Sequence, residues 1–200
     1  MAEHPDAQGG RLKRRAARKP ELRIVLDTNQ LFTGSASDLL RQEVAQLVQE
    51  CRRHEDVAFV WYIPEVVRLE RQYQMLEAGR KLLPALHRVE RLLGHSLGIN
   101  EEILAERVNT AIERQLTGLN LHVLPIDASR VDWRQLIEDA AGRRPPFEAG
   151  EHEKGFRDAL VVESVLQLIH DSPKSPTVCR VGLVTADALL SSTIERRTDG

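Results

Sequence analysis

The sequence predicts a three-layer α/β/α fold, in which helices cover both faces of a mostly parallel central sheet of four strands, or of five. Short apolar runs alternate with longer segments whose apolar residues recur at helical spacing, and this alternation is typical of a parallel sheet. Two runs, at 22–26 and 181–184, are apolar enough for strands buried on both faces. We therefore expect these two strands to be central neighbours. A chain of 200 residues suits one domain with a sizeable core.

The first half of the domain is predicted to contain two strands and four helices. The loop after 22–26 holds Ser35 and Ser37, either of which is suited to cap a helix that continues to about His54. The second strand follows at 57–63, and Pro64 is well placed in the first turn of a new helix. Further helices are expected at 81–97, with Pro84 near the start, and from Asn100 to Leu116.

The second half repeats the alternation. A third strand is expected at 119–126 and a short helix at 131–141. Residues 142–155 form a long irregular stretch, and long loops in a compact domain tend to be functional or disordered. A mostly buried helix follows from Phe156, then the strand at 181–184 and a last helix at 188–196.

Composition and charge limit the class of protein. No apolar run approaches the length of a membrane span, and the N-terminus lacks the apolar segment of a secretory signal. The only cysteines, Cys51 and Cys179, have neither metal-ligand spacing nor a disulfide framework, so we expect a cytoplasmic protein. Aromatic residues make up 4%, which leaves few platforms for stacking bases.

The domain proper is expected at 21–200, after a basic N-terminal arm at 1–20. Residues 11–19 hold six basic residues and no acid, and the arm lacks hydrophobic periodicity, so we expect it to be disordered. Such a run is able to bind a phosphate backbone electrostatically. The alternative is a solvated tail without a ligand.

Four carboxylates fall at corresponding edges of the predicted elements. Asp27 and Asp187 follow strands, Asp158 begins a helix, and Glu70 lies in the helix after the second strand. In parallel sheets these edges converge, and ligands bind there. Converging carboxylates repel one another, and a hard divalent cation such as Mg²⁺ or Mn²⁺ removes that repulsion. The alternative for each residue is a helix cap or turn residue.

Two further acids keep the assignment open. Glu65 lies near Glu70 but about 140° round the helix, so only one of them is able to face the strand ends. Asp127 follows the third strand and is a reserve candidate, although a turn or cap role suits it better.

The chain resembles PIN-domain nucleases from about residue 22 to 195, and most closely a bacterial branch with a helical insert. Four segments carry the resemblance: Ile24–Asn29, Ile63–Glu70, Lys154–Leu160 and Leu183–Asp187. It implies a nuclease that depends on Mg²⁺ or Mn²⁺ and usually acts on RNA. The metal site and catalytic acids would be Asp27, Glu70, Asp158 and Asp187. The helical insert would be 81–117.

The resemblance also implies supporting residues and partners. Asn29 and Thr185 would orient a carboxylate or a bound water, and Lys154 and Arg157 would lie near the scissile phosphate unless they are ordinary surface charges. Family members carry a fifth strand after the last helix, so the resemblance implies a fragment or a missing edge strand. Expected partners are nucleic acid, RNA before DNA, a second copy of the chain, and an inhibitory antitoxin-like protein. The competing interpretation is a PIN-like module that binds nucleic acid or protein without cutting.

Overall fold

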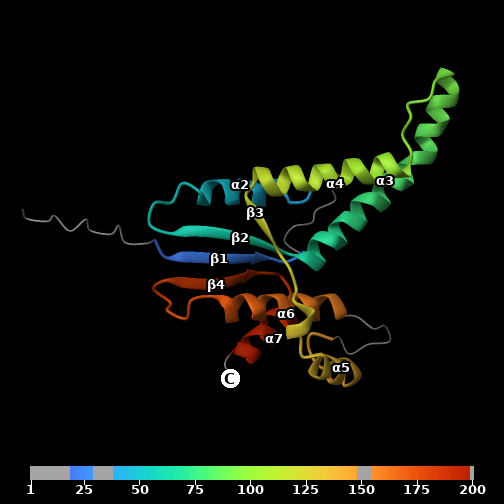
Figure 1. Ribbon diagram of the computed structural model, residues 1–200. Coiled ribbons are helices and arrows are strands. Elements are labelled where there is room, and N and C mark those ends of the chain that lie inside the picture. Colours follow the sequence, from blue (N-terminus) through green and yellow to red (C-terminus); the bar gives the residue numbers. More distant parts are fainter. Residues whose placement is uncertain (1–18, 29–37, 148–154, 199–200) are drawn as a thin grey trace, which may run out of the picture.

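The computed structural model describes residues 19–28, 38–147 and 155–198. Within them, four strands form one all-parallel sheet in the order β3–β2–β1–β4 (Figure 1). The strands are β1 (Glu21–Leu26), β2 (Ala58–Pro64), β3 (Leu121–Leu124) and β4 (Cys179–Val184). This confirms the predicted fold class and all four predicted strands. The strands at 22–26 and 181–184 are neighbours as expected, but β4 lies at an edge of the described sheet and not in its centre.

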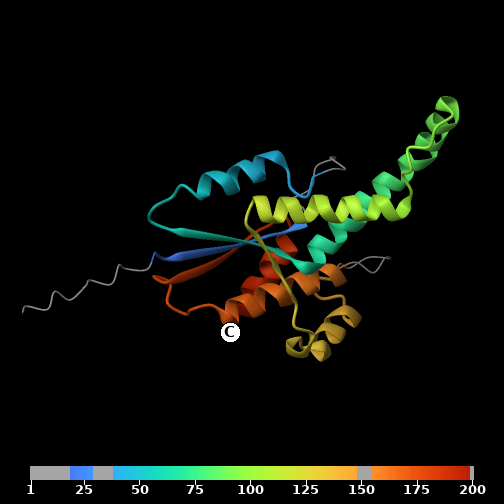
Figure 2. The same cartoon turned by 45° about the horizontal axis from the view of Figure 1, so that its top comes forward.

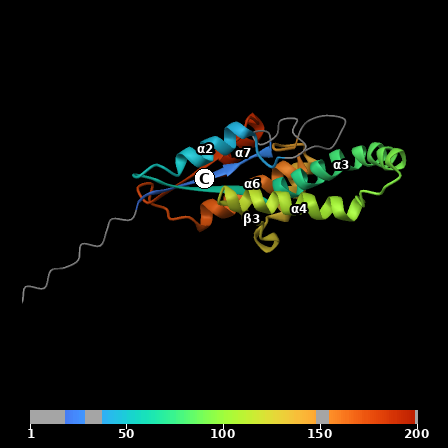
Figure 3. The same ribbon diagram turned by 90° about the horizontal axis from the view of Figure 1, so that it is seen from above.

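Helices cover the sheet on both sides. They are α2 (Gln42–Cys51), α3 (Glu65–Leu93), α4 (Glu101–Gly118), α5 (Trp133–Ala141), α6 (Phe156–Asp171) and α7 (Ala188–Thr198), with a 3₁₀ turn at Ala128–Arg130. Seen from above, α2 and α7 lie on one side of the sheet and α4 and α6 on the other (Figure 3). The expected three layers are therefore present.

The core lies between the sheet and these helices. Val25 and Leu26 at the end of β1 are almost completely buried, as are Val161, Val162 and Val165 of α6. Burial of a side chain of this size contributes about 1.5–3 kcal/mol to folding. These buried side chains fix the end of β1 and the first turns of α6, which are the elements that carry Asp27 and Asp158.

The segment expected as two helices is one continuous helix. Helix α3 has 29 residues and passes through Pro84, which is exposed. Proline removes one hydrogen bond from a helix, and at an exposed position water is able to satisfy the carbonyl that is left over. Gly94 ends α3 in the left-handed conformation, and Asn100 caps α4 through a hydrogen bond from the Ile103 amide. The outer part of α3 extends well away from the domain (Figure 2).

The other predicted boundaries need small corrections. Leu39 and Leu40 are buried but precede α2, which starts at Gln42 rather than near Ser37. Ser35 and Ser37 lie outside the described residues, as does the arm at 1–18. None of the described helices is both long enough and apolar enough to cross a membrane.

Candidate functional site

The carboxyl ends of β1 and β4 lie side by side and bring Asp27 next to Thr185. Leu26 is in register with Val184, and the Asp27 amide donates to the Val184 carbonyl at 3.1 Å. The Thr185 hydroxyl donates to Asp27 Oδ2 at 2.7 Å, while the Thr28 amide donates to Oδ1 at 2.7 Å. Asp27 is only 3% exposed. Both oxygens of this buried carboxylate are therefore held in place, one by Thr185 and the other by Thr28.

Asp187 lies two residues further on and is tied to the same threonine. Its amide donates to Thr185 Oγ1 at 2.9 Å. Its Oδ1 accepts hydrogen bonds from the amides of Leu189 (2.7 Å) and Leu190 (3.1 Å), which lie in the first turn of α7. Asp187 is thus a helix cap, the alternative that the sequence left open. The cap fixes one oxygen, and the other has no hydrogen-bond partner among the described residues.

Asp158 lies in the first turn of α6 and is half-buried. Burial raises the pKa of its carboxyl group above the ordinary value, and the negative charges of Asp187, Asp27 and Glu70 raise it further. Arg157 acts in the opposite direction. Because one charge acts on the pKa of another group only at short range, Asp27, Glu70 and Asp187 all lie near Asp158. We call Asp27, Glu70, Asp158 and Asp187 the acid cluster.

Gly155 sets the position from which Asp158 enters the cluster. Its φ of +109° is a conformation that residues with a side chain rarely adopt. A Cβ atom at this position would lie 2.6 Å from the Pro146 carbonyl oxygen and 2.7 Å from the Phe147 Cα. Glycine therefore allows the backbone to pass close to 146–147 immediately before α6 begins.

Glu70 lies in the second turn of α3 and connects that helix to the other acids. Its Oε2 accepts a hydrogen bond from the Thr28 hydroxyl at 3.4 Å, and Oε1 accepts one from Gln74 Nε2 at 3.4 Å. Oε1 also forms an ion pair with Arg157. The charge of Glu70 is one of those that raise the pKa of Asp158. Of the two acids that the sequence left open, the structure therefore brings Glu70 to the cluster.

Arg157 lies between the cluster and solvent. Its side chain is 62% exposed, whereas that of Glu70 is 17% exposed. The guanidinium therefore covers one side of the acids and is open to solvent on the other. Arg157 therefore lies beside the acids, and its expected role near a scissile phosphate stays a prediction.

Asp127 is not part of the cluster. It caps the 3₁₀ turn by accepting hydrogen bonds from the Ser129 amide (3.0 Å) and hydroxyl (2.6 Å). These two hydrogen bonds lower the pKa of its carboxyl group. Its role is therefore the cap that the sequence favoured. Asn29 and Lys154 lie outside the described residues.

Two contacts of Glu70 are absent from the sequence interpretation. Thr28 lies in the segment Ile24–Asn29, but no role of its own is predicted for it from the sequence. It bonds to Asp27 through its amide and to Glu70 through its hydroxyl. Gln74 was not identified, although it lies one helical turn after Glu70 and such pairs face each other. The signal for Gln74 was therefore present. The contact between Thr28 and Glu70 joins two distant elements and leaves no local pattern.

The chemistry of the acid cluster suits a hard divalent cation. Carboxylate oxygens are the ligands that Mg²⁺ and Mn²⁺ prefer, and burial together with three neighbouring negative charges raises the pKa of Asp158. Among the described residues, no three histidine, cysteine or acidic side chains are already grouped closely enough to hold a metal ion. Holding one would require side-chain movement, which includes opening the ion pair between Glu70 and Arg157.

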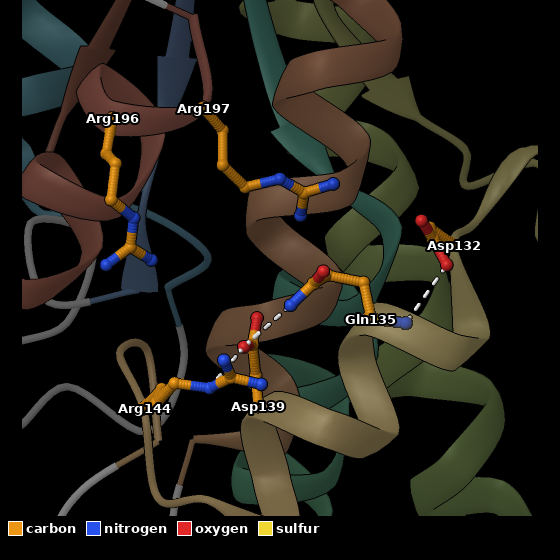
Figure 4. Close-up of a pocket in the computed structure, with 6 residues that line it drawn as sticks. All are labelled: Asp132, Gln135, Asp139, Arg144, Arg196 and Arg197. Carbon is orange, nitrogen blue, oxygen red and sulfur yellow. Dashed lines mark hydrogen bonds and ion pairs between the residues drawn. The ribbon is translucent and has the colours of Figure 1, made fainter. Parts of the chain in front are cut away.

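A cavity of about 520 Å³ is formed by a different set of residues (Figure 4). Its lining consists of Asp132, Gln135, Asp139, Arg144, Arg196 and Arg197. Arg144 pairs with Asp139 at 3.0 Å, and Arg197 pairs with the buried Glu163. The cavity shares no residue with the acid cluster, and two of its three guanidinium groups are already neutralised. The acid cluster is therefore the stronger candidate site.

Comparisons of the chain with models of known families, with curated proteins and with solved structures gave no match.

Proposed function

We propose that this protein is a nuclease that depends on Mg²⁺ or Mn²⁺ and hydrolyses phosphodiester bonds, with RNA as the first substrate to test. One observation carries the proposal: carboxylates from four separate parts of the fold meet at the carboxyl edge of the sheet, where the charges of Asp27, Glu70 and Asp187 act on Asp158. Repulsion between these negative charges lowers the stability of the folded state, and a bound cation would relieve it. RNA is named because the resemblance to PIN-domain nucleases implies it.

The cation would be held by the four acids of the cluster. When bound, it would lower the pKa of a water molecule and neutralise charge on the phosphate. The residues of the chain do the positioning. Thr185 and Thr28 hold the two oxygens of Asp27, and the start of α7 holds one oxygen of Asp187. Asp27 and one oxygen of Asp187 are therefore oriented before the substrate arrives, whereas Glu70 must first leave its ion pair with Arg157.

Arg157 is assigned to the substrate phosphate. A guanidinium binds phosphate oxygens through two parallel hydrogen bonds, and that of Arg157 reaches solvent from the edge of the cluster. Contact with a phosphate would free Glu70 from its ion pair. Arg157 would therefore bind the phosphate and also make the Glu70 carboxylate available to the cation.

The test is an incubation of the purified protein with end-labelled single-stranded RNA and DNA in Mn²⁺, Mg²⁺ or EDTA. We expect metal-dependent cutting by the wild type and by Asp127→Asn, and at least a hundredfold slower cutting by Asp27→Asn. Asp127→Asn is a matched control, because it makes the same change after another strand but outside the acid cluster. Full activity of Asp27→Asn would remove this residue from the site.

The competing function is a module that binds RNA without cutting it. It predicts that RNA is retained in every metal and that no product forms. Cutting that survives in EDTA would contradict both functions.

A further inference from the structure

The outer part of α3 presents a row of large apolar side chains to solvent. Leu82, Leu86, Val89 and Leu93 recur at intervals of four, three and four residues, which places them on one face of the helix. Leu92 lies beside them. The exposed fractions are 67% for Leu82, 45% for Val89, 88% for Leu92 and 63% for Leu93, whereas Leu86 is partly buried. We call these five residues the arm stripe.

The arm stripe continues the face by which α3 packs on the domain. Val67, Arg71 and Met75 on that face are buried. Helix α4 packs closely against α3 up to Gly79, where an added Cβ would lie 2.7 Å from Leu104 Cδ1. Helix α4 does not extend beyond this point. The outer part of α3 stands away from the rest of the domain in two views (Figures 1 and 2). An apolar surface of this kind, on a rigid helix, is typical of a protein interface.

One border of the arm stripe is positively charged. Lys81 and Arg88 are two helical turns apart, and each immediately precedes a residue of the stripe. Both are exposed, and neither forms an ion pair within the described part of the chain. Glu90, the acid nearest to the stripe, accepts hydrogen bonds from the Leu97 amide (2.6 Å) and the Ser96 hydroxyl (3.2 Å). Its charge is therefore turned toward the returning loop and away from Lys81 and Arg88.

We propose that the arm stripe binds an amphipathic helix of a different protein whose apolar face is bordered by acidic residues. The spacing of the stripe matches the ridges of a second helix, and leucine and valine at these positions are typical of helix pairs. Acidic residues on the partner would meet Lys81 and Arg88. The acid cluster lies at the other end of α3, so it stays accessible while a partner occupies the arm stripe.

The same charges disfavour a second copy of this chain. In an antiparallel pair related by a two-fold axis, equal borders of the two helices face each other. Lys81 and Arg88 of one copy would then lie against the same residues of the other. Like charges across an interface oppose association and select another partner.

The proposal is tested with two synthetic helical peptides of about three heptads. Both carry leucine at the apolar positions, and the border positions are glutamate in one peptide and lysine in the other. Binding of each fluorescent peptide to the full chain is followed by anisotropy. We expect saturable binding of the glutamate peptide, and binding of the lysine peptide at least tenfold weaker.

Three variants separate the contributions. Leu82→Gln with Leu93→Gln keeps the helix propensity and should weaken binding of the glutamate peptide at least tenfold. Tyr73→Gln is the matched control: Tyr73 is an equally exposed apolar residue of α3 (61%) outside the stripe, and its loss should change nothing. Lys81→Glu with Arg88→Glu should reverse the preference between the peptides.

Equal binding of the two peptides, or none, would overturn the proposal. So would a dimer in sedimentation equilibrium that dissociates in the double glutamine variant, because the occupant would then be a second copy. Circular dichroism of every variant shows whether α3 is intact, and the charge-reversal variant keeps the test decisive if the glutamine variant loses structure.

Discussion

Replacing Thr185 by valine tests how the sheet edge holds Asp27. The two side chains have nearly the same shape, so the change leaves no cavity and removes only the hydroxyl group. That hydroxyl donates to Asp27 Oδ2 at 2.7 Å and accepts from the Asp187 amide at 2.9 Å. Asp27 is 3% exposed, so water is poorly placed to replace the lost donor.

The magnitude follows from the charge of the acceptor. A hydrogen bond to a charged group contributes about 1.5–3 kcal/mol, and a buried partner left unsatisfied loses this in full. Leaving the Asp187 amide without its hydrogen bond costs less than leaving Asp27 without its donor, since Asp187 is only half-buried. We expect Thr185→Val to lower the free energy of unfolding by about 2–3 kcal/mol. For a domain of this size, that lowers the melting temperature by about 4–12 °C.

The assay is urea unfolding followed by circular dichroism, in EDTA and at neutral pH. Thr185→Ser is the control, because it keeps the hydroxyl and loses only a methyl group, and it should lie within about 1 kcal/mol of wild type. A loss below about 0.5 kcal/mol in Thr185→Val would refute the reasoning, because Asp27 would then not depend on this donor.

Three further predictions concern other parts of the chain. Gly155→Ala should destabilise the protein by at least about 2 kcal/mol, because the backbone is strained for any other residue and the Cβ would contact the Pro146 carbonyl. A loss of less than half of this, measured by calorimetry, would contradict the close packing before α6. The raised pKa of Asp158 means that the folded state keeps a proton that the unfolded chain has released, so stability should fall as the pH rises from 3.8. Asp158→Asn should therefore melt above wild type at neutral pH in EDTA, and the difference should shrink below pH 3.8; a difference independent of pH would point to another cause. Deleting residues 1–19 should weaken RNA binding at low salt and leave it unchanged at high salt, as filter binding across a salt series would show. An equal loss at every salt concentration would show that the N-terminal arm does not bind RNA by electrostatic attraction alone.

The sheet was predictable because its signals are local. Each strand is a short apolar run, and the ends of 22–26 and 181–184 needed only the rule that parallel strands meet at one edge. The edge position of β4 was not predictable in this way, since strand order depends on contacts between distant segments. The sequence also failed to predict the continuous helix through Pro84, because proline usually ends a helix. Pro84 is exposed, so water is able to satisfy the carbonyl that proline leaves without a hydrogen bond.

The acid cluster was predictable as a set of residues but not as a set of contacts. The four acids were identified from their places after strands and at helix starts, and the structure brings them together. The hydrogen bond from Thr28 to Glu70 spans 42 residues, and the ion pair from Arg157 to Glu70 spans 87. Contacts over such separations are set by packing and have no periodic signature in the sequence.

Calorimetric titration with Mn²⁺ tests the central claim most directly, namely that the acid cluster is one cation site. The wild type should bind Mn²⁺, and its affinity should fall as the pH is lowered, since the raised pKa of Asp158 favours its protonated form. Asp158→Asn should bind at least tenfold more weakly, and Asp171→Asn, which removes an acid paired with Arg130, should bind like wild type. Equal Mn²⁺ affinity in all three proteins would contradict the account, because the cation would then bind without the acid cluster.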